Sequence, residues 1–222
     1  MTQRLHDRLF AGSGIASVVL MLAGAGIGTL GHNRNLTISS SPSDVARALA
    51  KPASAVYWTG AYIELLSFGF FLAFAIWACA KLGGGVLGQM ARAAATGYAT
   101  VSIGGLAVMD AIAYRSGKGM DVQLGTTLIT LTQALYVCTW FLAAFFLLAA
   151  GPLALAAGRR ALGRSAIAVA VVQLVLTAVS VDNLGQMTFL LWLAWIVYAS
   201  FALVRGERAH AGAGARAVPQ GA

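Results

Sequence analysis

The chain has 222 residues, of which 59% are hydrophobic and 10% charged, and its 15 Lys and Arg against 7 Asp and Glu give a net charge of +8. A soluble domain carries roughly 25% charged residues, and a disordered chain is poor in hydrophobic residues, so both classes are excluded. The apolar residues stand in long blocks, and the mean hydropathy is +0.79. The composition therefore predicts an integral membrane protein.

Six apolar blocks are long enough to cross a membrane, because a helical crossing needs about 20 residues at about 1.5 Å each. The blocks are residues 10–30, 56–82, 91–114, 124–150, 165–181 and 187–204. We therefore expect an all-α, polytopic bundle of six transmembrane helices within residues 1–204. A tail at 205–222, rich in Gly, Ala and Arg, is expected to be disordered in the cytoplasm.

The first block contains Gly24, Gly26 and Gly28. Small residues four apart let the backbones of two membrane helices approach closely, so Gly24 and Gly28 predict a helix-packing surface. A nucleotide-binding glycine loop is disfavoured, because the strand, loop and helix that such a loop needs are missing.

The loop after the first block carries the signals of a short helix at about 41–51. Ser41 is a suitable N-cap, Pro42 suits the first helical position, and Asp44 lies at the third. Asp44 and Arg47 are three residues apart and can pair. We expect an amphipathic helix over the outer mouth of the bundle, acting either as a lid or as an interfacial connector that ends at Pro52.

The basic residues predict the orientation of the helices. Lys and Arg are enriched in cytoplasmic loops, and ten of them fall on one side of the predicted topology against five on the other. The richer side holds Arg4, Arg8, Lys81, Arg92, Arg159, Arg160, Arg164, Arg205, Arg208 and Arg216. Both termini lie on that side and are expected in the cytoplasm, in a multi-pass protein of the inner (cytoplasmic) membrane.

Three of the seven acidic residues lie in or against the hydrocarbon: Glu64, Asp110 and Asp182. The other four fall in loops or at the ends of the chain: Asp7, Asp44, Asp121 and Glu207. Membrane carboxylates cost about 2.5–3.5 kcal/mol each on insertion scales, so they normally face the bundle interior and mark function. The topology places the three acids on separate helices at one level in the outer half, where we expect a catalytic group.

Each acid also has a structural interpretation. Asp182 beside Asn183 is a typical turn residue, and Asp110 can pair with Arg115 or reach the membrane surface. Glu64 has no cationic neighbour three or four residues away and is the best functional candidate.

Polar and aromatic residues form stripes on the predicted helices around these acids. The stripe on the second span comprises Tyr57, Gly60, Ala61, Glu64, Ser67, Phe68 and Phe71, and the stripe on the fourth comprises Thr126, Thr130, Gln133 and Trp140. The expected substrate-binding residues are Tyr57, Tyr62, Phe68, Tyr114, Gln133, Tyr136, Trp140, Trp192 and Trp195. Such stripes can line one cavity open to the outer side. Alternatively, the polar groups bond between helices and the outer tyrosines form an aromatic belt at the membrane surface.

Metal and cofactor chemistry has no support in the sequence, since the spacings of His, Cys and Asp typical of metal sites are absent. A nucleic-acid partner is disfavoured because the cations are dispersed over short loops. We therefore expect no cofactor or metal, with membrane lipid and a lipophilic small molecule as partners.

The long first outer loop with its Pro-Ser-Asp helix and the short last hairpin resemble a bacterial family of six-helix membrane proteins of unknown function. The acids Glu64 and Asp182, on the second helix and late in the chain, are also similar in placement to those of small integral membrane terpene cyclases. That resemblance implies an isomerase- or lyase-like enzyme that cyclises a prenyl substrate after protonating it. The chain has six spans where the fungal cyclases of that kind have seven.

A protonated Glu64 in an aromatic-lined cavity is itself suited to donate a proton to an alkene or epoxide, with aromatic faces stabilising the carbocation. Asp110 or Asp182 would then orient the acid or accept the final proton. Two other functions remain open: a small proton- or cation-coupled transporter, and a non-catalytic membrane assembly protein. Against transport, the inner halves of the spans lack ionisable groups, and no inverted repeat is evident.

Overall fold

The computed structural model describes the backbone of residues 3–32, 36–179 and 185–215, and the side chains of 5–32, 36–178 and 187–205. The described residues form seven helices and no strands. The helices are α1 (Gln3–Gly31), α2 (Pro42–Leu49), α3 (Ala55–Leu82), α4 (Gly85–Arg115), α5 (Val122–Ala156), α6 (Arg160–Val179) and α7 (Gly185–Ala215). Six of them, all except α2, are long and apolar enough to cross a membrane. The predicted all-α, six-span membrane bundle is therefore confirmed.

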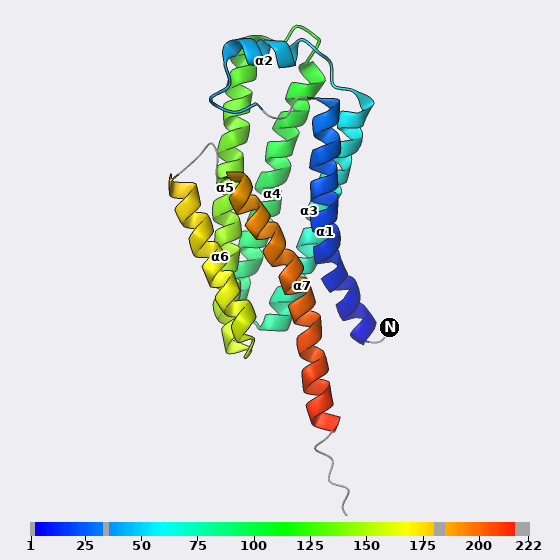
Figure 1. Ribbon diagram of the computed structural model, residues 1–222, viewed down its shortest axis with the longest axis vertical. Helices are drawn as coiled ribbons and strands as arrows, with labels where there is room; N and C mark the ends of the chain where they lie inside the picture. The colour runs from blue at the N-terminus through cyan, green and yellow to red at the C-terminus, as the bar shows by residue number, and fades with distance from the viewer. Residues whose placement is uncertain (1–2, 33–35, 180–184, 216–222) are drawn as a thin grey trace, which may run out of the picture.

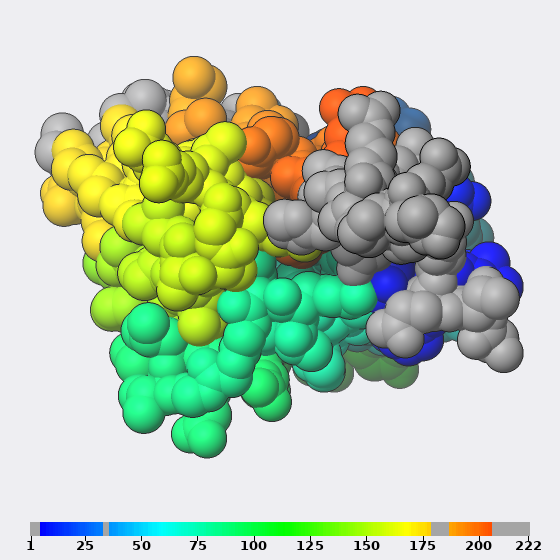
Figure 2. All heavy atoms as spheres, turned by 90° about the horizontal axis from the view of Figure 1, so that it is seen from below, coloured from blue at the N-terminus to red at the C-terminus, as the bar shows by residue number. Residues whose placement is uncertain are grey.

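Figure 1 shows the six long helices running roughly along one axis, with α2 lying across one end. We call this the α2 end; the first residues of α1 and the last residues of α7 lie at the opposite, terminal end (Figure 1). Figure 2 looks at the terminal end, where the turns from α3 to α4 and from α5 to α6 are both visible. The helices extend beyond the predicted spans, and α7 continues to Ala215. The expectation of disorder from residue 205 thus differs from the structure over 205–215, a segment with four Ala and two Arg, which favour a helix, beside three Gly, which do not.

The short helix α2 forms as its capping residues predict. The Ser41 hydroxyl accepts a hydrogen bond from the Asp44 backbone N–H at 3.2 Å, Pro42 opens the helix, and Arg47 lies 3.6 Å from the Asp44 carboxylate. Its buried Val45 and Leu49 form a small apolar cluster with residues of α4 and α5. At its end, the Leu49 carbonyl accepts a hydrogen bond from Gly117 N–H at 2.7 Å. Gly117 has φ +72°, a conformation that favours glycine, so the turn after α4 is shaped to hold α2.

Helices α1 and α3 cross at the glycines that the sequence singled out. A Cβ atom added to Gly24 would lie 2.5 Å from the Glu64 backbone nitrogen. One added to Gly60 would lie 2.6 Å from Gly28 Cα and 2.7 Å from the Gly24 carbonyl oxygen. The two backbones are therefore in direct contact, and this contact fixes the position of Glu64 relative to α1.

The middle of the bundle is filled by aromatic side chains from four helices. Trp192 of α7 packs against Phe71 of α3 at 5.6 Å, Tyr98 of α4 at 5.5 Å and Phe146 of α5 at 5.6 Å between ring centroids. All four side chains are at most 4% exposed. Edge-to-face packing of this kind is favourable.

Helices α6 and α7 cover only part of the bundle. Figure 1 shows the last turn of α6 and the first turn of α7 well short of the α2 end. Among the described residues, therefore, the long helices that reach α2 are α1, α3, α4 and α5.

Candidate functional site

A cavity of about 200 Å³ lies in this four-helix part of the bundle, and Glu64 lines it. Its other lining residues come from α1, α4 and α5 and from the loop before α2: Ala25, Thr29, Leu36, Met109, Ile129, Thr132, Gln133 and Tyr136. Glu64 is 9% exposed, so its carboxyl group is almost entirely surrounded by protein. Thr29, by contrast, is exposed, so the cavity has an open edge on α1.

Polar groups from α5 face Glu64 across this cavity. Gln133 donates a hydrogen bond from Nε2 to the Leu36 carbonyl at 3.4 Å, which ties α5 to the loop before α2. The Thr132 hydroxyl donates to the Leu128 carbonyl at 2.9 Å and keeps acceptor capacity. The phenol of Tyr136 can both donate and accept. With Thr29 of α1, the site thus combines one carboxyl group with four neutral polar side chains and an apolar wall.

The second predicted acid, Asp110, accepts a hydrogen bond outside the Glu64 cavity. Asp110 accepts a hydrogen bond from the Tyr57 hydroxyl at 2.8 Å, and Tyr57 is fully buried. Along α3, Tyr57 precedes Glu64 by seven residues, or about 10 Å at 1.5 Å per residue. Neither Asp110 nor Tyr57 lines the Glu64 cavity. Asp110 therefore links α4 to α3 nearer the α2 end, and its expected catalytic role beside Glu64 stays a prediction. Asp182 lies outside the described residues.

Two of the predicted substrate-binding tyrosines point away from the cavity. Tyr62 is 62% exposed and Tyr114 is 60% exposed. Tyr114 lines a separate surface hollow with Trp58, and the Lys118 ammonium lies 3.6 Å from its ring centroid. A side chain on the outer, lipid-facing side of a helix end is typical of the aromatic belt, which was the alternative interpretation.

The deeper aromatic residues also lie outside the cavity. Trp192 and Trp195 stack on each other at 6.2 Å in the aromatic core, and Phe68 packs against Tyr98 at 6.4 Å. Trp140 is half-buried one turn beyond Tyr136 and is not part of the cavity wall. Of the nine predicted binding residues, the structure therefore places Gln133 and Tyr136 beside Glu64.

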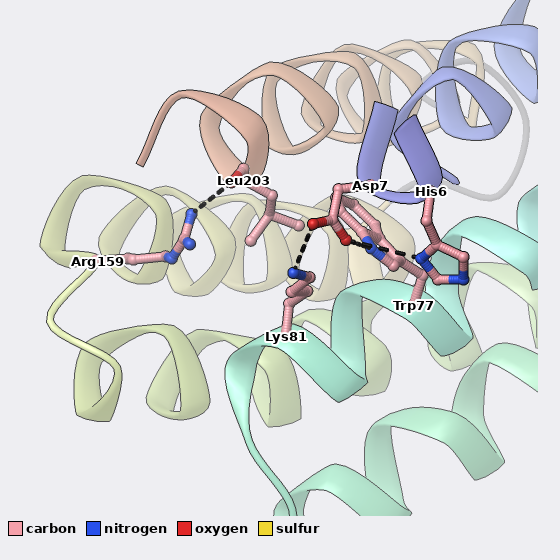
Figure 3. Close-up of polar contacts among 6 residues, drawn as sticks. All are labelled: His6, Asp7, Trp77, Lys81, Arg159 and Leu203. Atoms are coloured by element: carbon pink, nitrogen blue, oxygen red, sulfur yellow. Dashed lines mark hydrogen bonds and ion pairs between the residues drawn. The ribbon is translucent and has the colours of Figure 1, made fainter. Parts of the chain in front are cut away.

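A second buried carboxylate, which the sequence placed merely at a cytoplasmic end, lies at the terminal end of the bundle. Asp7 is 2% exposed; it accepts hydrogen bonds from Trp77 Nε1 at 3.0 Å and Lys81 Nζ at 2.9 Å, and His6 Nδ1 lies at 3.8 Å (Figure 3). The same view shows Arg159, which donates to the Leu203 carbonyl at 3.1 Å. The spacing of Trp77 and Lys81, four residues apart on one face, is the sequence signal that could have indicated a partner for Asp7.

We expect Asp7→Leu to destabilise the protein by about 2–3 kcal/mol, because it leaves a buried indole N–H and a largely buried ammonium without their acceptor. Lys81 is 23% exposed, so water compensates part of the loss. The midpoint of unfolding in mixed detergent micelles measures the effect, with Arg8→Leu at the exposed neighbouring position as the matched control. Adding Lys81→Met to Asp7→Leu should restore part of the stability; a double variant no more stable than Asp7→Leu alone would contradict the ion-pair role.

The sequence matches no family model, and it has no significant match among curated proteins or solved structures. The resemblances to a six-helix bacterial family and to membrane terpene cyclases therefore remain expectations. The functional argument depends on the geometry around Glu64.

Proposed function

We propose that this protein is an integral membrane enzyme that moves a proton to and from a lipophilic substrate, with Glu64 as the acid–base group. The observation that carries the proposal is a carboxyl group 9% exposed on the wall of a small cavity at membrane depth. A protonated carboxyl group in such a cavity can donate a proton to a substrate, and the resulting carboxylate can take one back.

The size of the cavity indicates how the substrate binds. Its volume of about 200 Å³ is below the roughly 300–1,000 Å³ typical of sites that enclose a whole ligand. The cavity therefore takes the reacting part of a longer molecule, and the rest extends past the open edge at Thr29. Gln133 and Tyr136 orient that part through hydrogen bonds, while Met109 and Ile129 contact its apolar surface.

The reaction class is an isomerisation or cyclisation of a prenyl or terpenoid-like chain. Glu64 transfers its proton to one carbon of an alkene, and the π-electron pair forms the new C–H bond. The adjacent carbon becomes a carbocation, which a second double bond of the chain can attack to close a ring. The Glu64 carboxylate then removes a proton from a carbon next to the cation, so that the acid is regenerated and no other reactant is consumed.

A proton- or cation-coupled transporter is the second candidate, since Asp7 adds a buried carboxylate at the terminal end that the sequence interpretation did not include. The aromatic core of Phe71, Tyr98, Phe146 and Trp192 lies between the two acids and favours the enzyme. A transporter would need these packed rings to separate in each cycle.

The test compares lipid extracts from cells that produce the protein with extracts from cells that lack it, analysed by mass spectrometry. We expect a lipid of unchanged mass but altered retention, as an isomerisation or cyclisation requires. Identical extracts, together with a proton flux in liposomes containing the purified protein, would replace this proposal with the transporter.

A further inference from the structure

A larger hollow of about 660 Å³ lies at the α2 end, between the last turn of α1 and the face of α2. It is lined by Thr29, Leu30, Gly31, His32, Leu36, Ser40, Asp44, Arg47, Ala48, Lys51 and Pro52. Thr29 and Leu36 also line the Glu64 cavity, so the two spaces adjoin.

The two spaces differ in depth. Gly31, in the wall of the hollow, packs against the backbone of Tyr57, whereas Gly24 packs against that of Glu64. Gly24 and Gly31 are seven residues apart on α1, and Tyr57 and Glu64 are seven residues apart on α3. At 1.5 Å per residue, the hollow therefore lies about 10 Å from the level of Glu64, toward the α2 end. This is the arrangement that an amphiphile requires, with its head at the interface and its tail in the hydrocarbon.

The charges in the hollow favour an anionic head. Arg47 and Lys51 are both exposed there, against a single carboxylate, Asp44. Hydrogen bonds from Ser41 and the nearby Arg47 lower the pKa of Asp44, so this carboxylate is charged at neutral pH. The Asp44–Arg47 pair is solvent-exposed, and such pairs contribute little. A phosphate, which accepts two parallel hydrogen bonds from a guanidinium, can therefore compete for Arg47.

We infer that the hollow binds the phosphate head of a lipid whose tail enters the Glu64 cavity, with Arg47 and Lys51 as the phosphate-binding residues. The inference rests on the proposed function and names its substrate class. Because Glu64 lies about 10 Å below the head, it acts on the tail and not on the phosphate ester.

The test measures binding of farnesyl phosphate, farnesol and phosphatidic acid to the full chain in detergent by native mass spectrometry. We expect the wild type to bind farnesyl phosphate at least about tenfold more tightly than farnesol, and Arg47→Gln/Lys51→Gln to remove that difference. Arg115→Gln, which changes a cation at the same end outside the hollow, should retain it. Asp44→Asn removes the carboxylate that competes for Arg47, so this variant should bind farnesyl phosphate more tightly than the wild type. This measurement still tests the phosphate site if Arg47→Gln/Lys51→Gln does not fold.

The outcomes separate this inference from the proposed function. Equal binding of farnesol and farnesyl phosphate by the wild type would overturn the phosphate site. If Arg47→Gln/Lys51→Gln loses the preference for farnesyl phosphate but Glu64→Gln still turns over substrate, the phosphate site is supported and the acid–base role of Glu64 is ruled out. Phosphatidic acid bound as tightly as farnesyl phosphate would support the phosphate site and identify its source as the bilayer.

Discussion

Glu64→Gln should lower the rate of product formation by about 10²–10⁴-fold, the usual contribution of a general acid. Glutamine has nearly the same shape as a protonated glutamic acid and can hydrogen-bond within the same cavity, but its amide N–H groups are not acidic enough to transfer a proton. Glu64 is 9% exposed and its backbone lies directly against Gly24, so a side chain of equal size is needed to preserve the α1–α3 contact. The rate is measured with purified protein in lipid nanodiscs.

Asp110→Asn is the matched control for the loss of a membrane carboxylate. Asparagine keeps the oxygen that accepts the 2.8 Å hydrogen bond from the Tyr57 hydroxyl, and Asp110 does not line the Glu64 cavity. We expect its rate to stay within a few-fold of wild type. An equal loss in both variants would instead support the two-carboxylate mechanism expected from the sequence.

Folding must be checked in the same preparations. Glu64→Gln should unfold at the same detergent concentration as the wild type, because it removes neither volume nor hydrogen-bonding capacity. A correctly folded Glu64→Gln protein with wild-type turnover would eliminate the acid–base role.

Local signals predicted the parts of the fold that depend on neighbouring residues in the chain. The capping of α2 by Ser41, Pro42 and Asp44 follows from residues within one turn of one another, and it is observed as predicted. The seven-residue stripe predicted on α3 is buried throughout: Tyr57, Gly60, Ala61, Glu64, Ser67, Phe68 and Phe71. The helical period predicts which residues share this face, and their polar or small side chains predict that it is turned toward the bundle interior.

Hydrophobicity could not distinguish helix surfaces that pack on protein from those that face lipid, because lipid tails are as apolar as the core. The stripe predicted on the fourth span is an example, since Thr130 is exposed and Thr132 is buried instead. For the same reason Tyr62 was expected in the cavity and is found on the surface. The Asp7 cluster joins residues 70 and more positions apart, a contact that only the tertiary structure brings together.

The largest effect on stability is expected from Gly60→Ala, a change of a single methyl group. That methyl would lie 2.6 Å from Gly28 Cα and 2.7 Å from the Gly24 carbonyl oxygen, and backbone atoms have no rotamer by which to move away. The helices α1 and α3 must separate instead, which loses packing along their length. Overpacking of this kind costs about 1–3 kcal/mol even where flexible side chains absorb it, so we expect a loss of about 3 kcal/mol or more.

Gly26→Ala makes the same chemical change two residues from Gly24 on α1, where a Cβ atom would meet nothing within 4 Å. Alanine favours a helix over glycine by up to about 1 kcal/mol, so this variant should be as stable as the wild type or more stable. The two substitutions are thus expected to shift the unfolding midpoint in opposite directions. Because the same crossing places Glu64, Gly60→Ala should also reduce turnover in the protein that remains folded; a Gly60→Ala protein with wild-type stability would show that the two backbones are not in contact.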